Sequence, residues 1–298
     1  MKDRMVIPPE RQETWTWPAV AMFTLVGMGA GLYLSSALLN LVSGDLRLFA
    51  AGPISYGSVA CLTVILGFLF VMGEAGRPLR GHYALSNIKR SWMSREILFL
   101  LIFILTVFID YIVPSVVIRV LSLGAAFILI LCQGFIIYGS RGITAWNKSF
   151  IPLFFLSSGL SSGYGLLFLI TDVHGLVRWR VSALTGSILL ALTLVISLIY
   201  LYASRDDAFR IATKSLRNPF FLLINMGIGG VLPLVLLLLL LNSTEKSNIR
   251  SIKEIIVLIA GITMVIGGIS QKASMIMAAG FTRGIFLSFE EGRLKKEG

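Results

Sequence analysis

The sequence predicts an all-α integral membrane protein with eight transmembrane helices in a single bundle. Of its 298 residues, 56% are hydrophobic and only 14% are charged, and the mean hydropathy is +0.86. A soluble domain carries about a quarter of charged residues. The apolar residues gather into runs of about 20, which is the length of a membrane-spanning helix, whereas barrel strands alternate over about half that length.

Eight apolar runs define the expected helices. They are residues 17–42, 51–73, 97–113, 115–138, 150–171, 181–203, 220–241 and 254–279. The segments between them are short, so we expect a single membrane domain over residues 1–298. The first run is too long for the apolar part of a secretory signal and has no persuasive cleavage site near its end, so we expect it to remain as a permanent helix.

Small residues recur at four-residue spacing within the runs. Gly27 and Gly31 form one such pair, and Gly159 and Gly163 form another. This spacing lets helix backbones approach closely, so it indicates packing positions. Gly230 and Pro233 offer a break in the seventh run, as in transporters with discontinuous helices, although no matching break marks a second repeat.

Lys and Arg are distributed unevenly between the two sides of the expected membrane. With eight spans both termini lie on one side, and that side carries eighteen of the 26 basic residues. The opposite side carries six, while Arg119 and Lys272 fall within spans. The positive-inside rule therefore places both termini and the loop at residues 74–96 in the cytoplasm, in a protein of the inner membrane. Topology thus accounts for the net charge of +11 without nucleic-acid binding.

Cysteine and histidine placement argues against a bound metal centre. Cys61 and Cys132 lie inside spans without a second Cys at metal or disulfide spacing. The two histidines, His82 and His174, fall in loops. A transmembrane b-type haem is usually held by two histidines that project into a bundle. We therefore expect no haem, iron–sulfur cluster or other metal site in this chain.

Three charged residues lie within or at the ends of spans. Asp110 and Arg119 flank the hairpin at Pro114. They are interpreted as a structural ion pair, with a proton exit relay as the alternative. Lys272 stands near the end of the eighth run, where its side chain either extends to the lipid headgroups or turns inward to meet a glutamate.

The loop between the second and third spans carries the most chemistry. Glu74 directly follows the second run and Glu96 directly precedes the third. A carboxylate at such a border is costly because partial desolvation disfavours its ionised form, so it is typical of proton chemistry, ion binding or an ion pair. The loop also supplies enough groups to dock a partner or an amphipathic ligand. These are Arg77, Arg80, His82, Lys89, Arg90, Trp92 and Arg95.

A second loop on the same side has a related composition. It contains Arg141, Trp146 and Lys148. Trp146 is interpreted as an anchor at the membrane interface. The alternative is that Trp146, Asn147 and Lys148 line a pocket at the level of the headgroups.

Four segments resemble a known family. They are Gly-Glu-Ala-Gly-Arg-Pro-Leu-Arg at 73–80, Ala-Leu-Ser-Asn-Ile-Lys-Arg-Ser-Trp-Met-Ser-Arg-Glu-Ile at 84–97, Ala-Trp-Asn at 145–147 and Gly-Gly-Ile-Ser-Gln-Lys at 267–272. They resemble the DMSO reductase membrane-anchor (DmsC-like) family, which belongs to the wider group of NrfD-like and polysulfide-reductase-like quinone subunits. The resemblance covers nearly the whole chain and is most specific between Gly73 and Glu96.

The resemblance implies a haem-free membrane-anchor subunit of an oxidoreductase of anaerobic respiration. Such a subunit exchanges electrons between membrane quinone, either menaquinone or ubiquinone, and a four-cluster iron–sulfur subunit. That partner in turn serves a molybdopterin or tungstopterin catalytic subunit, so this chain would hold no catalytic centre. With the basic loop on the cytoplasmic side, we expect cytoplasmic partners in a sulfite dehydrogenase-like or DMSO reductase-like complex.

The family associates the positions of Glu74 and Glu96 with the quinone site. Some relatives carry His at the position of Glu74 and Arg at the position of Lys272. The residues expected to bind quinone or transfer protons are Glu74, Glu96, His82, Arg77, Arg80, Trp92 and Lys272. Those expected to dock the partner are Lys89, Arg90, Arg95, Arg141, Trp146 and Lys148.

The alternative function is a secondary transporter or proton channel that uses Glu74, Glu96 and Lys272. Many transporters are built from inverted repeats, and none is evident in this sequence. The basic residues also cluster at one face of the membrane. Both observations favour the membrane anchor.

Overall fold

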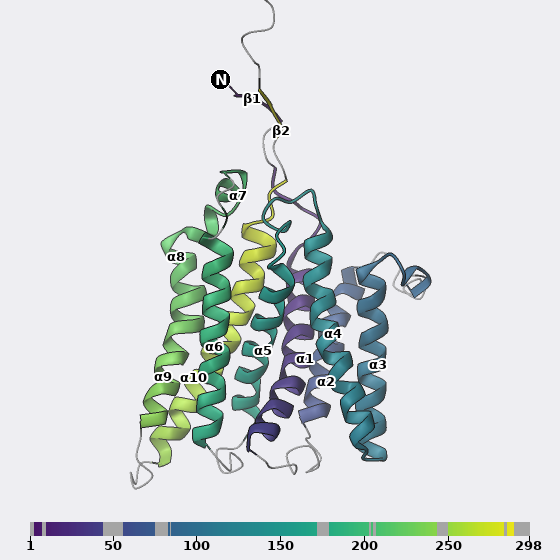
Figure 1. The fold of residues 1–298 in the computed structure, drawn as a ribbon, viewed down its shortest axis with the longest axis vertical. Coiled ribbons are helices and arrows are strands. Elements are labelled where there is room, and N and C mark those ends of the chain that lie inside the picture. Colours follow the sequence, from purple (N-terminus) through teal and green to yellow (C-terminus); the bar gives the residue numbers. More distant parts are fainter. Residues whose placement is uncertain are drawn as a thin grey trace, which may run out of the picture.

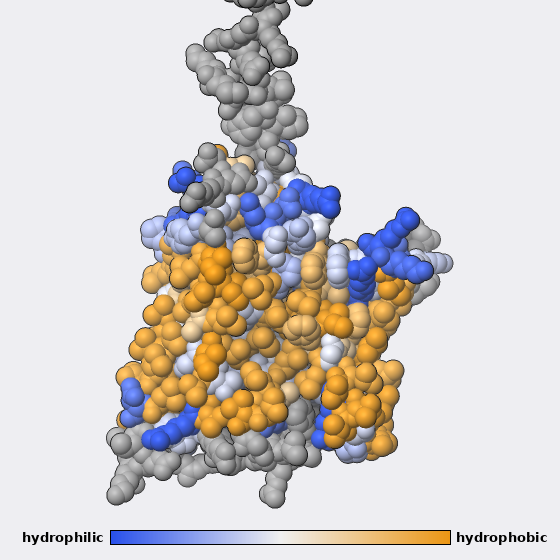
Figure 2. All heavy atoms as spheres, viewed as in Figure 1, coloured by the Kyte–Doolittle hydropathy of each residue, from blue (hydrophilic) through white to orange (hydrophobic). Residues whose placement is uncertain are grey.

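The computed structural model confirms eight helical segments long and apolar enough to cross a membrane (Figure 1). The structure describes residues 3–7, 10–43, 56–74, 83, 85–171, 179–202, 204, 207–242, 250–282 and 285–288. Within these, the spans are Trp17–Val42, Tyr56–Gly73, Trp92–Ile112, Val116–Gly139, Ile151–Ile170, Trp179–Tyr202, Pro219–Asn242 and Ile252–Ala278. On the face shown in Figure 2, apolar side chains form a broad band across the helices, and hydrophilic side chains gather at the two ends.

Six of these spans are single α-helices. They are α1 (Trp17–Ser43), α2 (Tyr56–Glu74), α3 (Trp92–Ile112), α4 (Val116–Gly139), α5 (Ile151–Ile170) and α6 (Trp179–Tyr202). The remaining helical segments are α7 (Asp207–Ala212), the 3₁₀ turn η3 (Ser215–Arg217), α8 (Pro219–Leu222), the π-helix η4 (Leu223–Val231), α9 (Leu232–Asn242), α10 (Arg250–Ala273) and the π-helix η5 (Ser274–Ala278). Strands β1 (Asp3–Ile7) and β2 (Ile285–Ser288) pair antiparallel beyond one end of the helices (Figure 1).

Helix α1 lies in the middle of the structure and packs against α2, α4, α5 and α10. Its two small residues meet those of α5. A side-chain carbon on Gly31 would collide with the backbone of Gly159, and one on Gly163 would collide with the backbone of Gly31. The four-residue spacing therefore marks the closest approach of α1 and α5, as expected for small residues at a membrane helix interface.

Helix α3 begins at Trp92, five residues before the apolar run that predicted it. Ser91 caps the helix, because its side-chain oxygen accepts a hydrogen bond of 3.3 Å from the backbone N–H of Ser94. The Arg95 guanidinium donates to the carbonyls of Ile88 and Lys89, at 3.0 and 2.8 Å. The start is thus set by polar capping rather than by hydrophobicity. Glu96 consequently lies in the second turn of α3 and not at the foot of the helix.

The seventh span is composite rather than a continuous α-helix. The π-helix η4 joins α8 to α9 and ends at Val231, just before Pro233. Gly229 in η4 packs directly on Gly267 of α10, where neither position has room for a side chain. The irregularity considered from Gly230 and Pro233 is therefore a π-helix, a rare conformation that is often found at functional sites.

The hairpin between α3 and α4 is closed by an ion pair at the end of the bundle opposite the strands. The Arg119 Nε lies 2.9 Å from Oδ2 of Asp110 and 3.2 Å from Oδ1. The backbone N–H of Ser115 donates to the same carboxylate at 2.9 Å. The carboxylate thus joins the two helices and the turn between them, which is the structural role considered for this pair.

Candidate functional site

Glu96 of α3 is a buried carboxyl group. Only 2% of the residue is exposed. The side-chain amide of Gln133 on α4 lies within hydrogen-bonding reach of the carboxyl group, while Oε1 of Glu96 makes no hydrogen bond to any residue that the structure describes. Burying an ionisable group in a membrane-spanning helix costs free energy. Such groups in membrane proteins are therefore usually functional.

Lys272 lies in the last turn of α10 and is fully buried, with 0% exposed. Its side chain therefore turns inward instead of extending to the headgroups. The ammonium lies 6.0 Å from the ring centroid of Phe155 on α5. It makes no hydrogen bond to a described residue, and no described carboxylate lies within ion-pair distance. A direct contact with a glutamate is thus not seen among the described side chains, and the side chain of Glu74 lies outside them.

Gly27 of α1 provides the room in which these polar groups meet. A side-chain carbon at this position would collide with Nζ of Lys272 and would lie 3.0 Å from Oε1 of Gln133. Both atoms therefore border the same small space, and neither has a hydrogen-bond partner among the described residues. The Gln133 amide nitrogen contacts Sδ of Met22 at 3.7 Å.

Helices α3, α4 and α10 thus supply one acid, one amide and one base, with the amide linked to the acid and bordering the same space as the base. We call Glu96, Gln133 and Lys272 the buried polar cluster. The amide oxygen of Gln133 borders the space beside Gly27 that Nζ of Lys272 also borders. The same amide group lies within hydrogen-bonding reach of the Glu96 carboxyl group. Such a set can donate and accept protons inside a region from which water is largely excluded.

Residues 7–283 match the family model described as "Polysulphide reductase, NrfD". The chain belongs to the NrfD family. NrfD-family membrane subunits are quinone-interacting anchors that pair with iron–sulfur and molybdopterin subunits in membrane complexes. No curated protein matches the chain. The match includes the buried polar cluster.

Some residues expected in an NrfD-type quinone site lie outside the described part of the chain. Arg77, Arg80 and His82 are among them. For Glu74 only the backbone is described, as the last residue of α2. Their proximity to Glu96 and Lys272 therefore stays a prediction.

Trp92 lies at the start of α3 and is held there by its neighbours. Its ring stacks on Phe135 of α4, with centroids 4.3 Å apart and planes 12° apart. The Arg95 guanidinium covers the ring at 4.2 Å from the centroid. Arg95 is therefore engaged by Trp92 and by the two carbonyls before α3, so its guanidinium organises this helix start.

The residues expected to dock a partner fall into two groups. Lys89, Arg90 and Arg141 are exposed, on the same end of the bundle as the strands. Lys148 is half-buried, and its ammonium lies 4.8 Å from the ring centroid of Phe209. Lys89, Arg90 and Arg141 therefore present their charges to the solvent on this face.

Trp146 departs from the sequence expectation of an interfacial anchor or docking residue. It is only 2% exposed, and its indole N–H donates to the carbonyl of Met275 at 2.9 Å. Its ring packs 5.4 Å from that of Trp15. The loop folds over the end of α10, and the hydrogen bond satisfies the buried indole, so Trp146 is a core residue.

The sequence analysis did not identify Gln133 and treated Gly27 only as a packing position. A neutral amide and a glycine attract little attention beside charged residues. A usable signal was present, since Gln133 is the only carboxamide in the fourth apolar run. Its proximity to Met22, Gly27 and Glu96 is a property of the packed helices.

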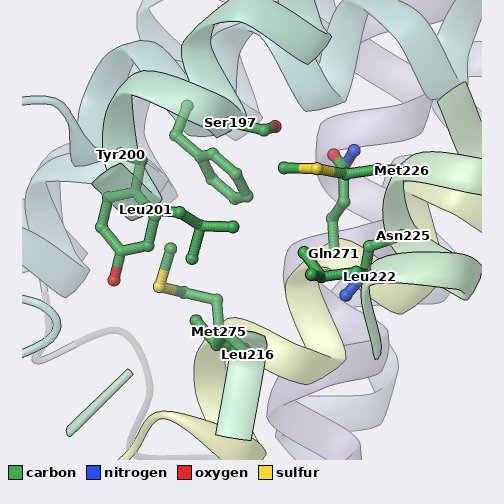
Figure 3. Close-up of a pocket in the computed structure, with 10 residues that line it drawn as sticks. Ser197, Tyr200, Leu201, Leu216, Leu222, Asn225, Met226, Gln271 and Met275 are labelled. Carbon is green, nitrogen blue, oxygen red and sulfur yellow. The ribbon is translucent and has the colours of Figure 1, made fainter. Parts of the chain in front are cut away.

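A separate small cavity lies on the other side of α10. It has a volume of about 30 Å³ and is lined by Ser197, Tyr200, Asn225, Gln271 and Met275, among others (Figure 3). Oε1 of Gln271 makes no hydrogen bond to a described residue. This volume suits one or two water molecules, which need polar partners of this kind. Gln271 and its neighbour Lys272 thus serve different faces of the same helix.

Proposed function

We propose that this NrfD-family subunit binds quinone at the buried polar cluster and relays protons there, while electrons pass to or from a partner iron–sulfur subunit. The observation that carries the proposal is that Gln133 and Lys272 meet beside Gly27 while Glu96 lies within hydrogen-bonding reach of Gln133. Each of the three has a buried polar atom with no hydrogen-bond partner among the described residues. Native proteins rarely leave buried polar atoms without partners. A ligand with two carbonyl oxygens suits this donor and acceptor set.

A quinone, when bound, supplies two-electron chemistry coupled to two protons. The ammonium of Lys272 and the amide of Gln133 would hold its oxygens by donating hydrogen bonds. The carboxyl group of Glu96 can hold a proton or accept one, as general acid–base catalysis at such oxygens requires. Gln133 lies within hydrogen-bonding reach of the carboxyl group, and its amide oxygen borders the same space as the ammonium, so it can orient the carboxyl group toward a ligand held there.

The position of the cluster supports electron exchange with a docked subunit. Glu96 lies four residues after the start of α3 and Gln133 six residues before the end of α4, so both are within about 9 Å of the helix ends along the axes. That end carries the exposed Lys89, Arg90 and Arg141. A partner bound there would bring its own iron–sulfur cluster close to the buried polar cluster. This chain therefore needs no metal ligand for electron transfer.

The finer assignment follows the sequence resemblance and the charge distribution. The eighteen basic residues on the side of the termini favour a cytoplasmic docking face in the inner membrane. The partners are then a four-cluster iron–sulfur subunit and a molybdopterin or tungstopterin catalytic subunit, in a DMSO reductase-like or sulfite dehydrogenase-like complex. Menaquinone and ubiquinone both fit the chemistry of the cluster.

The test compares two carboxyl groups of the same chain. Glu96→Gln removes the proton carrier and keeps the shape, while Glu254→Gln changes a glutamate near the start of α10, at the opposite end of the bundle. We expect Glu96→Gln to lower quinone-linked activity about 10²-fold, the usual contribution of a positioned acid or base. Dye-linked activity of the catalytic subunit and assembly of the complex should stay normal, and Glu254→Gln should resemble the unaltered protein.

Other outcomes would reject parts of the proposal. Normal quinone kinetics in Glu96→Gln would remove Glu96 from the site. Equal loss of quinone-linked and dye-linked activity would assign it to assembly. A chain that purifies without iron–sulfur and molybdopterin subunits, and that conducts protons in liposomes free of quinone, would instead support the transporter or channel alternative.

A further inference from the structure

A large groove runs along the outer face of α10, away from the buried polar cluster. Its volume is about 430 Å³. Its lining comes from α1, α8, α10, η5 and the segment before α1. The lining residues are Arg11, Trp17, Phe221, Ile266, Ile269, Ser270, Ala273, Ser274, Met277 and Ala278.

The wall of the groove is apolar over most of its length. Ile266 and Ile269 are 41% and 40% exposed. From Ile266 to Ala278 the groove follows twelve residues, about 18 Å at a rise of about 1.5 Å per residue. An apolar channel of this length within the membrane-spanning zone suits a hydrocarbon chain.

The polar end of the groove is formed by Arg11. Its Nε donates to the carbonyl of Met277 at 3.1 Å, which anchors the guanidinium over η5. Arg11 is exposed and makes no ion pair with a carboxylate that the structure describes. The terminal nitrogens of an arginine form a fork that matches phosphate. Trp17, 60% exposed, lies at the same end, as interfacial tryptophans do.

We propose that this groove binds an anionic phospholipid, with the phosphate on Arg11 and an acyl chain along Ile266 and Ile269. The positive charge at the polar end favours an anionic lipid over a zwitterionic one. This site is distinct from the buried polar cluster, because Lys272 faces Gly27 and Gln133 on the other side of α10.

The polar atoms of the groove wall also argue against a quinone headgroup here. Ser270 donates to Oδ1 of Asn225, and the Asn225 amide donates to the Ser274 hydroxyl at 3.0 Å. Both hydroxyls are thus engaged by η4. Arg11 remains as the headgroup contact, and its charge selects an anion.

The experiment is native mass spectrometry of the full-length chain in detergent. The probes are dioleoyl phosphatidylglycerol, dioleoyl phosphatidylcholine and menaquinone. We expect retention of phosphatidylglycerol over phosphatidylcholine. Arg11→Gln should weaken phosphatidylglycerol binding about fivefold, the usual contribution of one basic residue near anionic lipid. Arg90→Gln removes an exposed arginine outside the groove and should leave binding unchanged.

A second pair of variants tests the apolar wall. Ile269→Trp fills the groove and should abolish retention of the lipid. Ile262→Trp changes an isoleucine of similar exposure on the same helix, outside the groove, and should have no effect. Equal retention of the two phospholipids, equal effects of Arg11→Gln and Arg90→Gln, or displacement of phosphatidylglycerol by menaquinone would each overturn the proposal.

Discussion

Gly27→Ala offers a sharp test of the buried polar cluster, because the added methyl group meets the ends of two side chains. The new carbon would overlap Nζ of Lys272 and lie 3.0 Å from Oε1 of Gln133. Non-bonded heavy atoms prefer separations of about 3.5 Å or more. The ammonium must therefore retreat by about 1 Å and the amide oxygen by about 0.5 Å. Both are far ends of flexible side chains, so the backbone can stay in place.

The expected result separates activity from stability. Misplacing a reacting group by about 1 Å costs about 10²-fold in rate, so quinone-linked activity should fall by about that factor. The free energy of unfolding should change by less than about 1 kcal/mol, because no backbone atom has to move. Dye-linked activity of the catalytic subunit reports whether the complex has assembled.

Gly31→Ala is the matched control one turn further along α1. Its added carbon would collide with the backbone carbonyl of Gly159, which cannot retreat without separating α1 from α5. We expect this variant to lose about 1–3 kcal/mol, measured as a lower thermal transition in detergent. Full quinone-linked activity in Gly27→Ala would refute the role of the ammonium position. Equal destabilisation by the two variants would show that Gly27 serves packing alone.

Three further predictions concern the rest of the chain. Trp146→Phe leaves the Met275 carbonyl without its buried donor and should cost about 1–3 kcal/mol of stability, whereas Trp17→Phe, at an exposed position, should cost little; thermal unfolding of both variants decides. Asp110→Asn should lower stability by about 1–3 kcal/mol, because it removes the counter-charge of the mostly buried Arg119, and unchanged quinone-linked activity is expected. Reporter fusions at the C-terminus should be active in the cytoplasm only, and activity outside would reverse the topology.

The spans were predictable because hydropathy is a property of whole segments. Their existence required no knowledge of which helix touches which. The start of α3 was not predictable in the same way, since Ser91 and Arg95 set it through hydrogen bonds within a polar stretch. The apolar run begins only after the polar residues, at residue 97. A helix predicted from that run alone therefore has Glu96 at its edge, whereas α3 contains Glu96 in its second turn.

Two of the three residues of the buried polar cluster could be predicted from the sequence. Glu96 and Lys272 stood out because charges are rare in apolar runs. Gln133 and Gly27 did not, because their importance depends on four helices meeting at one point. Trp146 misled for a related reason: an aromatic residue beside a basic loop is typical of the membrane interface, and only the packed loop reveals that its indole bonds to Met275.

The meeting of α1 with α10 has a consequence for biosynthesis. Gly27 lies on α1 and Lys272 on α10, so the space beside Gly27 stays unfilled until α10 has been synthesised and inserted. β1 and β2 likewise pair a segment before α1 with a segment after η5. A nascent chain halted before residue 272 therefore keeps Glu96 and Gln133 without their third partner. Synthesis through α10 is thus a condition for closing the cluster, and a chain truncated before α10 leaves these polar groups uncovered.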